Sequence, residues 1–445
     1  MDYIDLVIEK MVYGGYGFAR YDNKIYMVEH AYPGEFVRIK TKYNKKDVYF
    51  AEVVEYLEKA PYRNRPVCPH FYECGGCQLL DMDYSKQLEI KKSIVKEQMK
   101  RIGKIDESLV ENVVPSDEIN HYRSKMEFAF AYKNGEVKLG LKQRNSNEII
   151  DIKNCLLAPK EFNRIITEVK KIFEALDMKI YNPKRKKGEF KHLVLRKSFS
   201  KNEIMAIFIT KTEYISNYKK FKELILKNIK ADSFIHVMNG SDSVVLRGPY
   251  KTLRGEGVIK EDFDGFEYQI PPTAFFQNNY FITKKILEEF VEIVKSEKIS
   301  GTALDLYSGV GLFSIYLAPL LKHITGVESN NVSVKAAKAN ANINNIKNVS
   351  FVKEDVEKFI ENYDKKLDLI ILDPPRSGLS KKILTKITEL KPKYIFYLSC
   401  DPSTLARDLS KMQEFYNIEK IKPFDMFPNT FHIENFAFLK LKNSK

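Results

Sequence analysis

The five cysteines of the chain are the residues whose types and spacing point most directly to chemistry. Cys68, Cys74 and Cys77 form a C-x5-C-x2-C run with two glycines inside the closer pair, and Cys155 lies alone downstream. Four thiolates suit an iron–sulfur cluster or a zinc ion. Cys400 closes the apolar, strand-like run Y-I-F-Y-L-S, and a cysteine at a strand end is suited to be a nucleophile. We therefore expect a metal-bearing enzyme with a separate reactive thiol.

A glycine-containing turn predicts a cofactor site. The strand pattern Thr302–Tyr307 runs into Ser-Gly-Val-Gly, with Gly309 and Gly311, and an apolar helix and a second strand follow before Glu328. Glycines in a first strand–helix turn let the backbone approach a ligand, and an acid after the second strand can accept both ribose hydroxyls. Ser314 stands where a dinucleotide fingerprint has its third glycine. This favours S-adenosylmethionine, which has no pyrophosphate, over NAD.

Two further acids follow predicted strands of the same sheet. Asp355 ends a third strand and could meet an adenine amino group, although a helix N-cap explains it equally well. Asp373 ends a fourth strand in I-I-L-D-P-P-R, at the sheet edge where open parallel sheets bind ligands. Asp-Pro-Pro resembles the motif of amino-methyltransferases, but Arg376 replaces the aromatic residue that would stack the base.

Cys400 and Glu434 are a pair that uracil methylation needs. Cys400 ends a fifth strand, and Glu434 precedes a final strand, Asn435–Leu439. A thiolate that adds at carbon 6 of uracil makes an enolate whose carbon 5 can attack a sulfonium methyl, and a base then removes the carbon-5 proton. An amine-methylating enzyme needs no thiolate. We expect His432 to be structural or substrate-orienting rather than the base.

Alternation of hydrophobicity predicts a multidomain chain. We expect an OB-like β-barrel over 1–58, a mixed α+β central domain over 59–269 and an α/β Rossmann-like domain over 270–445. The expected barrel strands are Asp5–Met11, Gly17–Tyr21, Lys24–Val28, Glu35–Tyr43 and Val48–Glu55. A Lys-rich helix, Tyr84–Ile102, is expected to pack on the last domain.

Composition is compatible with a nucleic-acid partner. The net charge of +14 favours an anionic partner, although general lysine enrichment explains it as well. The run Lys184–Lys187, with His192 and Arg196, predicts phosphate contacts or a solvated hairpin tip, and Phe275 and Phe276 predict core positions rather than a stacking platform. No apolar run is long enough for a membrane span, no signal peptide opens the chain, and cysteines are few, so we expect a cytoplasmic protein.

These motifs together resemble the RNA uracil-5 methyltransferase family, particularly the iron–sulfur 23S rRNA (uracil-5-)-methyltransferases with an N-terminal TRAM domain. The matching stretches are C-P-H-F-Y-E-C-G-G-C, F-F-Q-N-N, L-D-L-Y-S-G-V-G, L-D-P-P-R-S-G-L, L-S-C-D-P-S-T-L-A-R-D-L and H-I-E-N, and they span essentially the whole chain. One departure is Leu312, where some relatives carry a polar residue.

The resemblance implies roles for the residues already singled out. Cys400 would be the nucleophile and Glu434 the base. The S-adenosylmethionine site would comprise Gln277, Tyr307, Gly309, Gly311, Glu328 and Asp373, with Asp355 near the adenine. A [4Fe–4S] cluster would be held by Cys68, Cys74, Cys77 and Cys155, with zinc as the alternative.

The implied substrate is a uridine in structured RNA, most directly 23S rRNA, with the T-loop uridine of tRNA as the alternative. No obligate protein partner is evident. An alternative of a different class is an RNA-binding protein or chaperone with a vestigial cofactor fold. The intact Cys400–Glu434 pair argues against this alternative.

Overall fold

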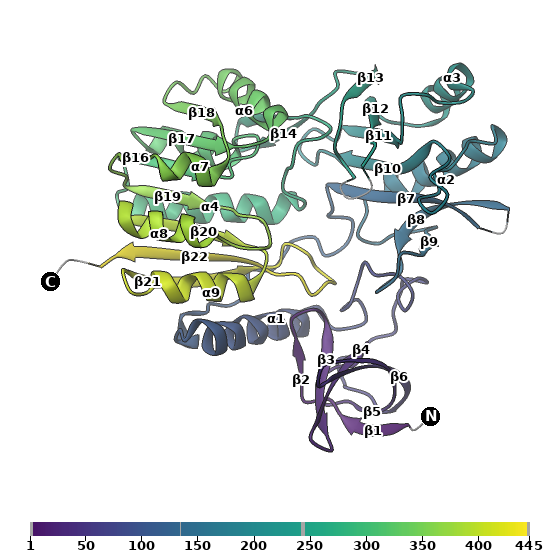
Figure 1. Cartoon of the computed structure of the whole chain (residues 1–445), viewed down its shortest axis with the longest axis horizontal. Helices are drawn as coiled ribbons and strands as arrows, with labels where there is room; N and C mark the ends of the chain where they lie inside the picture. Colours follow the sequence, from purple (N-terminus) through teal and green to yellow (C-terminus); the bar gives the residue numbers. More distant parts are fainter. Residues whose placement is uncertain (1–2, 134, 242–244, 443–445) are drawn as a thin grey trace.

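Three sheets and one hairpin organise the chain in a computed structural model that describes residues 3–133, 135–241 and 245–442. In Figure 1 the N-terminal sheet (purple) lies beside the long helix α1, the central sheet (blue to teal) lies to one side, and the C-terminal sheet (green to yellow) lies above α1. No helix within the described ranges is both long and apolar enough to span a bilayer.

The N-terminal sheet closes on itself. Its strands are β1 (Ile4–Val7), β2 (Lys10–Val12), β3 (Tyr16–Tyr21), β4 (Lys24–Glu29), β5 (Phe36–Lys45) and β6 (Val48–Glu58). Their order is β1-β5-β6-β4-β3-β2. The single expected strand Asp5–Met11 divides in two because Ile8 donates to the Glu35 carbonyl and Glu9 to the Phe18 carbonyl. One stretch of chain thus pairs with both ends of the sheet, which makes a small barrel.

A buried charge network fastens this barrel to the segment that follows it. The Arg63 side chain is 4% exposed and pairs with Glu35 at 2.5 Å and with Asp81, both fully buried. Its guanidinium also lies 4.0 Å from the centre of the Tyr32 ring, and the Tyr32 hydroxyl donates to Asp81. The barrel is therefore held by groups that are satisfied only when it is docked.

Helix α1 (Tyr84–Gln98) crosses from the barrel to the C-terminal domain, and a π-helical turn, Met99–Gly103, extends it. It packs on α9 (Pro402–Met412), and Ser403 of α9 donates to Gln98 at 3.2 Å. The expectation that this helix packs on the last domain is confirmed. Next, Val110 and Val114 form bridges with the edge strand β21 (Tyr416–Phe424).

The central sheet has the order β13-β12-β11-β10-β7-β8-β9 and is accompanied by two helices. Its elements are β7 (Lys125–Lys133), β8 (Glu136–Lys142), β9 (Ile149–Asp151), α2 (Lys160–Ala175), β10 (Phe190–Lys197), β11 (Ile204–Thr210), α3 (Tyr218–Asn228), β12 (Ser233–Met238) and β13 (Tyr250–Arg254). The run Lys184–Lys187 is an exposed turn before β10.

Arg196 is not available for phosphate, which corrects the expectation. It is 3% exposed and donates to the carbonyl of Ala274 at 2.5 Å, because the segment around Ala274 lies against that face of β10. Burial lowers the pKa of the nearby His192 to about 4, so this imidazole is neutral near pH 7.

The C-terminal sheet has the order β18-β17-β16-β19-β20-β22-β21, with all pairs parallel except those of β22. Its strands are β16 (Thr302–Leu306), β17 (His323–Glu328), β18 (Val349–Lys353), β19 (Leu369–Leu372), β20 (Tyr394–Ser399), β21 and β22 (Glu434–Leu441). Its other helices are α4 (Tyr280–Ser296), α5 (Leu312–Leu317), α6 (Asn331–Ile343), α7 (Val356–Glu361) and α8 (Lys381–Leu390). The hairpin of β14 (Ile259–Phe263) and β15 (Phe266–Ile270) packs on α6.

The Arg63 network generates a stability prediction. Replacing Arg63 by Met leaves two buried carboxylates without a cation and should lower the free energy of unfolding by about 3–5 kcal/mol. The matched control is Arg65→Met, because Arg65 is exposed, and this change should have little effect. Chemical denaturation of both variants measures the difference, and equal small effects would contradict a docking role for the network.

Candidate active site

Cys400 and Glu434 meet at one edge of the C-terminal sheet. Cys400 follows β20, and Glu434 is the first residue of β22, which runs antiparallel to β20. Ser399 pairs with Asn435, so Cys400 and Glu434 are the next residues outward on the two strands. The reversal of β22 therefore brings its first residue to the carboxyl edge of the parallel strands, where ligands bind.

Both side chains are electrostatically perturbed. Burial, and next to it the Glu434 carboxylate, raises the pKa of the Cys400 thiol to about 11. Burial and the nearby Asp373 raise the pKa of Glu434 well above its usual value, against an opposing effect of Arg376. Groups with pKa values shifted by burial and by specific charged neighbours at a sheet edge mark a candidate catalytic site.

Asp373 continues this acidic edge after β19. It accepts a hydrogen bond from the Gln277 side chain at 3.1 Å. Burial, followed by the charge of Asp305, raises the pKa of Asp373 to about 7. Asp305 is fully buried on β16 and accepts from the Ser314 hydroxyl at 2.6 Å. The Ser314 hydroxyl thus holds the Asp305 carboxyl in place beneath the site, and a glycine at position 314 would lack this hydrogen bond.

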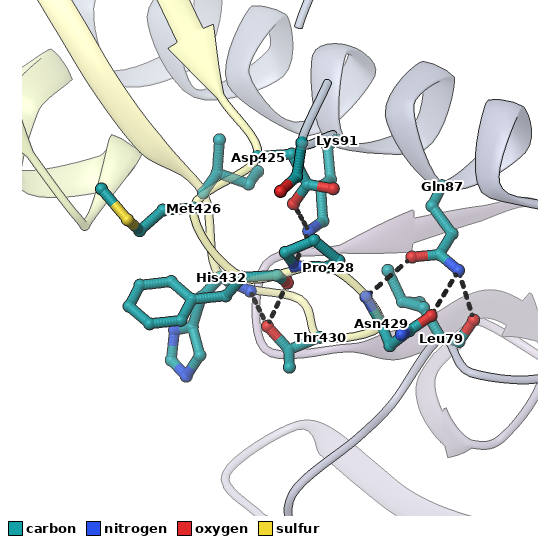
Figure 2. Close-up of polar contacts among 12 residues, drawn as sticks. Leu79, Gln87, Lys91, Asp425, Met426, Pro428, Asn429, Thr430 and His432 are labelled. Atoms are coloured by element: carbon teal, nitrogen blue, oxygen red, sulfur yellow. Dashed lines mark hydrogen bonds and ion pairs between the residues drawn. The ribbon is translucent and has the colours of Figure 1, made fainter. Parts of the chain in front are cut away.

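The connection between β21 and β22, residues 425–433, is called here the base loop because it leads directly to Glu434. Figure 2 shows His432 on this loop. Its ring lies 4.1 Å from that of Phe431, centre to centre. Burial, followed by Arg376, lowers the pKa of His432 to about 3, so it is neutral near pH 7 and a poor proton acceptor. Glu434 is the better base of the two.

The glycine turn after β16 has room for a ligand. Tyr307 has a φ of 70°, and Gly311 must be glycine because a Cβ there would stand 2.7 Å from the Phe351 ring. A Cβ on Gly309 would meet nothing within 4 Å, and the buried Ser308 hydroxyl finds no partner among the described residues. The Gly309 amide donates to Glu328 at 3.3 Å. An open backbone with an acid beside it fits an adenosyl ligand.

Asp355 has the helix-capping role that the sequence allowed as one of two interpretations. It is the N-cap of α7, and its Oδ1 accepts from the Glu357 and Lys358 amides at 3.0 and 3.3 Å. It also follows β18 at the same sheet edge as Glu328. The cap explains why an acid stands here without assigning it a ligand.

The four remaining cysteines line one small cavity. Its lining includes Cys68, Cys74, Cys77 and Cys155 together with Arg123. The four cysteines are free thiols. Within the described residues, no three His, Cys, Asp or Glu side chains are grouped so that they could hold a single metal ion. The thiols therefore border a shared space without converging on one point.

Arg123 supplies an independent test of what the cavity could hold. Its side chain contributes to the lining, and its buried Nε has no hydrogen-bond partner among the described residues. An unsatisfied buried donor beside four thiols fits an anionic group, such as a cluster ligated by four thiolates. Arg123 also lies over the Phe427 ring of the base loop, 5.7 Å from its centre.

Tyr13 reaches the site from the barrel, and sequence patterns gave no signal for it. Its hydroxyl donates to the Cys400 carbonyl at 3.0 Å, and its ring packs edge-on against Phe431 at 5.4 Å. Burial raises the pKa of Tyr13 above its usual value, and Asp401 and Cys400 add to this. The barrel therefore touches the backbone of the candidate nucleophile.

Phe275 corrects another expectation. Phe276 is buried as predicted, but Phe275 is 64% exposed, two residues before Gln277. The residue lies in the irregular segment between β15 and α4, where alternation does not report burial.

Comparisons with known proteins identify the family of the chain. The sequence profile of the tRNA (uracil-5-)-methyltransferase family matches residues 83–442. An uncharacterized RNA methyltransferase of Thermotoga maritima is 48% identical over 433 residues, 96% of each chain, and one of Aquifex aeolicus is 33% identical over 99% of each.

A solved structure extends the likeness to three dimensions. It is that of Pyrococcus abyssi tRNA (uracil-54, C5)-methyltransferase in complex with S-adenosyl-L-homocysteine. The TM-score is 0.77 at 28% identity, with 98% of this chain and 100% of the other covered. The thiol, the carboxylates and the glycine turn thus lie in a chain that belongs to the tRNA (uracil-5-)-methyltransferase family and is an RNA methyltransferase dependent on S-adenosylmethionine.

Proposed function

We propose that the protein methylates carbon 5 of a specific uridine in 23S rRNA through a covalent bond between Cys400 and carbon 6 of the uracil. The observation that carries this proposal is the meeting of Cys400 and Glu434 at one sheet edge. Amine methylation needs neither group, because an amine attacks a methyl donor without prior activation.

The reaction divides between the two side chains. The Cys400 thiolate adds to carbon 6, and the electrons of the carbon 5–carbon 6 double bond move to carbon 5 and the carbonyl oxygen. Once carbon 5 bears the methyl group, Glu434 takes its remaining proton. The double bond re-forms, and the carbon 6–sulfur bond breaks to release thiolate. The raised pKa of Glu434 makes its carboxylate a stronger base than an exposed glutamate.

S-adenosylmethionine supplies the electrophilic methyl group when bound. Gln277, Tyr307, Gly309, Gly311, Glu328 and Asp373 would hold it, with Asp355 on the adenine side. These residues all lie at or beside the carboxyl edge of the sheet, apart from Gln277, which the Asp373 hydrogen bond ties to that edge.

The second candidate substrate is the T-loop uridine of tRNA. Its support is the likeness to the Pyrococcus abyssi enzyme, which is named for uracil 54 of tRNA. The support for 23S rRNA is the cysteine spacing resembling that of the iron–sulfur rRNA enzymes. We further propose that the domain over 1–58, whose strands β1 to β6 form the barrel, is a TRAM-type RNA-binding domain and that the four cysteines hold a [4Fe–4S] cluster.

Mapping 5-methyluridine tests the substrate. Deleting the gene should remove 5-methyluridine from one or two positions of 23S rRNA and leave tRNA unchanged. A gene copy encoding Cys400→Ala should not restore the modification, whereas the native copy should. Loss confined to the tRNA T-loop would replace the rRNA assignment with the second candidate, and no loss in any RNA would refute both.

Covalent trapping tests the two catalytic roles. Cys400→Ala should form no RNA adduct, because the ring is never activated. Glu434→Gln should still methylate but release product about 10²–10⁴ times more slowly, the usual contribution of a general base. A methyl-labelled, RNA-shifted band should therefore accumulate in denaturing gels.

The matched control for this pair is Glu414→Gln, since Glu414 is an exposed acid of the same domain. It should release product at the native rate. RNA containing 5-fluorouridine should trap the native enzyme, since fluorine cannot leave as a proton does. Full activity of the Cys400→Ala protein would contradict the mechanism.

Metal analysis tests the cluster. Protein purified without oxygen should be brown and contain iron and acid-labile sulfide. Cys155→Ser should lower the iron content, whereas Cys400→Ser should retain it because Cys400 lies outside the cavity. Zinc in stoichiometric amount without sulfide would replace the cluster by the alternative ion.

A further inference from the structure

The base loop is held from outside its own sheet by two buried polar side chains of α1. Figure 2 shows Gln87 and Lys91 pointing from α1 into the loop. They are four residues apart, so they lie on one face of the helix, one turn from each other. Both are at most 1% exposed.

Lys91 holds the start of the loop. Its Nζ lies 2.5 Å from Asp425 Oδ1, with both side chains fully buried, and it also donates to the Phe427 carbonyl at 3.1 Å. A buried ion pair contributes little net stability, because desolvation offsets the attraction, and its best-attested use is to select one arrangement. This pair selects the path by which the loop leaves β21.

Gln87 holds the middle of the loop with both ends of its amide. Its Nε2 donates to Asn429 Oδ1 at 3.1 Å and to the Leu79 carbonyl at 2.9 Å, while its Oε1 accepts from the Asn429 amide at 3.0 Å. Asn429 has a φ of 66°, so the loop turns sharply where Gln87 grips it. The Asn429 carbonyl also accepts from the amides of Gln78 and Leu79.

These contacts continue to the catalytic end of the loop. The Phe427 carbonyl that accepts from Lys91 also accepts from the Thr430 hydroxyl at 2.8 Å. The same hydroxyl accepts from the His432 amide at 3.3 Å. A short series of hydrogen bonds thus runs from α1 to the residue two positions before Glu434.

We propose that Gln87 and Lys91 are positioning residues for proton abstraction: by fixing the base loop, they place the Glu434 carboxylate against carbon 5 of the uracil. The inference rests on the proposed function. The hydrogen bonds of Gln87 and Lys91 go to the base loop and to the carbonyls of Leu79 and Met82 rather than to Cys400. Addition of Cys400 to carbon 6 should therefore depend on these two residues less than proton abstraction does.

Two rates separate these steps. Trapping on 5-fluorouridine RNA reports every step up to methylation and does not require the base. Release from the methylated adduct of ordinary uridine RNA reports the base. Gln87→Met keeps the length of the side chain and removes its four hydrogen bonds. Lys91→Met combined with Asp425→Leu removes the ion pair without leaving a lone buried charge.

Both variants should trap 5-fluorouridine RNA within about twofold of the native rate. Release should slow by about tenfold or more, because a displacement near 1 Å at a catalytic group can cost up to a hundredfold. The methylated adduct should therefore accumulate. Lys86→Met is the matched control, because Lys86 is on the same helix but pairs with Glu89 at the surface, and both of its rates should be native.

Equal slowing of the two rates would show a general structural role and overturn the assignment. Native release by the Gln87→Met protein, or by the double variant at native stability, would overturn it as well. If the native enzyme traps no 5-fluorouridine RNA, the proposed function itself fails and the assignment falls with it. The melting temperature of each variant is measured together with the two rates, so that a loss of stability is recognised.

Discussion

The pairing of β20 with β22 is the constraint on which the active site depends. A nucleophile at the end of a parallel strand can meet a base on another strand only if that strand also presents an end at the same edge. The antiparallel register of Ser399 with Asn435 meets this condition, since it turns the start of β22 toward the end of β20. A parallel last strand would leave Glu434 at the far edge of the sheet, away from Cys400. Phe424, the last residue of β21, pairs with Glu434 at this same edge, so the loop of residues 425–433 is longer than the antiparallel connection requires.

The same edge gathers carboxyl groups whose pKa values are raised by burial. The charge of Asp305 raises the pKa of Asp373, and that of Asp373 raises the pKa of Glu434. A sulfonium cation among these acids would lower their pKa values and that of the Cys400 thiol, since opposite charges favour the ionised form. Binding of the methyl donor would thus make both the nucleophile and the base more available.

The residues that end strands could be predicted from the sequence. Cys400 and Glu434 could be placed together because strand ends of one sheet meet at an edge, and a helix cap was one of two alternatives predicted for Asp355. Burial that comes from another part of the chain could not be predicted: Arg196 was expected to be accessible, but the segment around Ala274 covers its strand. The exposure of Phe275 was missed for another reason, because this residue lies in an irregular segment without hydrophobic alternation. The contacts of the barrel and of α1 with the site join positions 387 and 342 residues apart, and no local pattern encodes them.

The separation of Lys91 from Asp425 has a consequence for synthesis of the protein. The two residues are 334 positions apart, so the helix that carries Lys91 leaves the ribosome long before its partner is made. Until then its charged amine must remain in water, because burial without Asp425 would strand a charge. Docking of α1 must therefore wait for almost the whole chain, and folding should include a late step dominated by long-range contacts. A truncated product that lacks the last two strands would keep this helix undocked and expose its apolar face to chaperones and proteases.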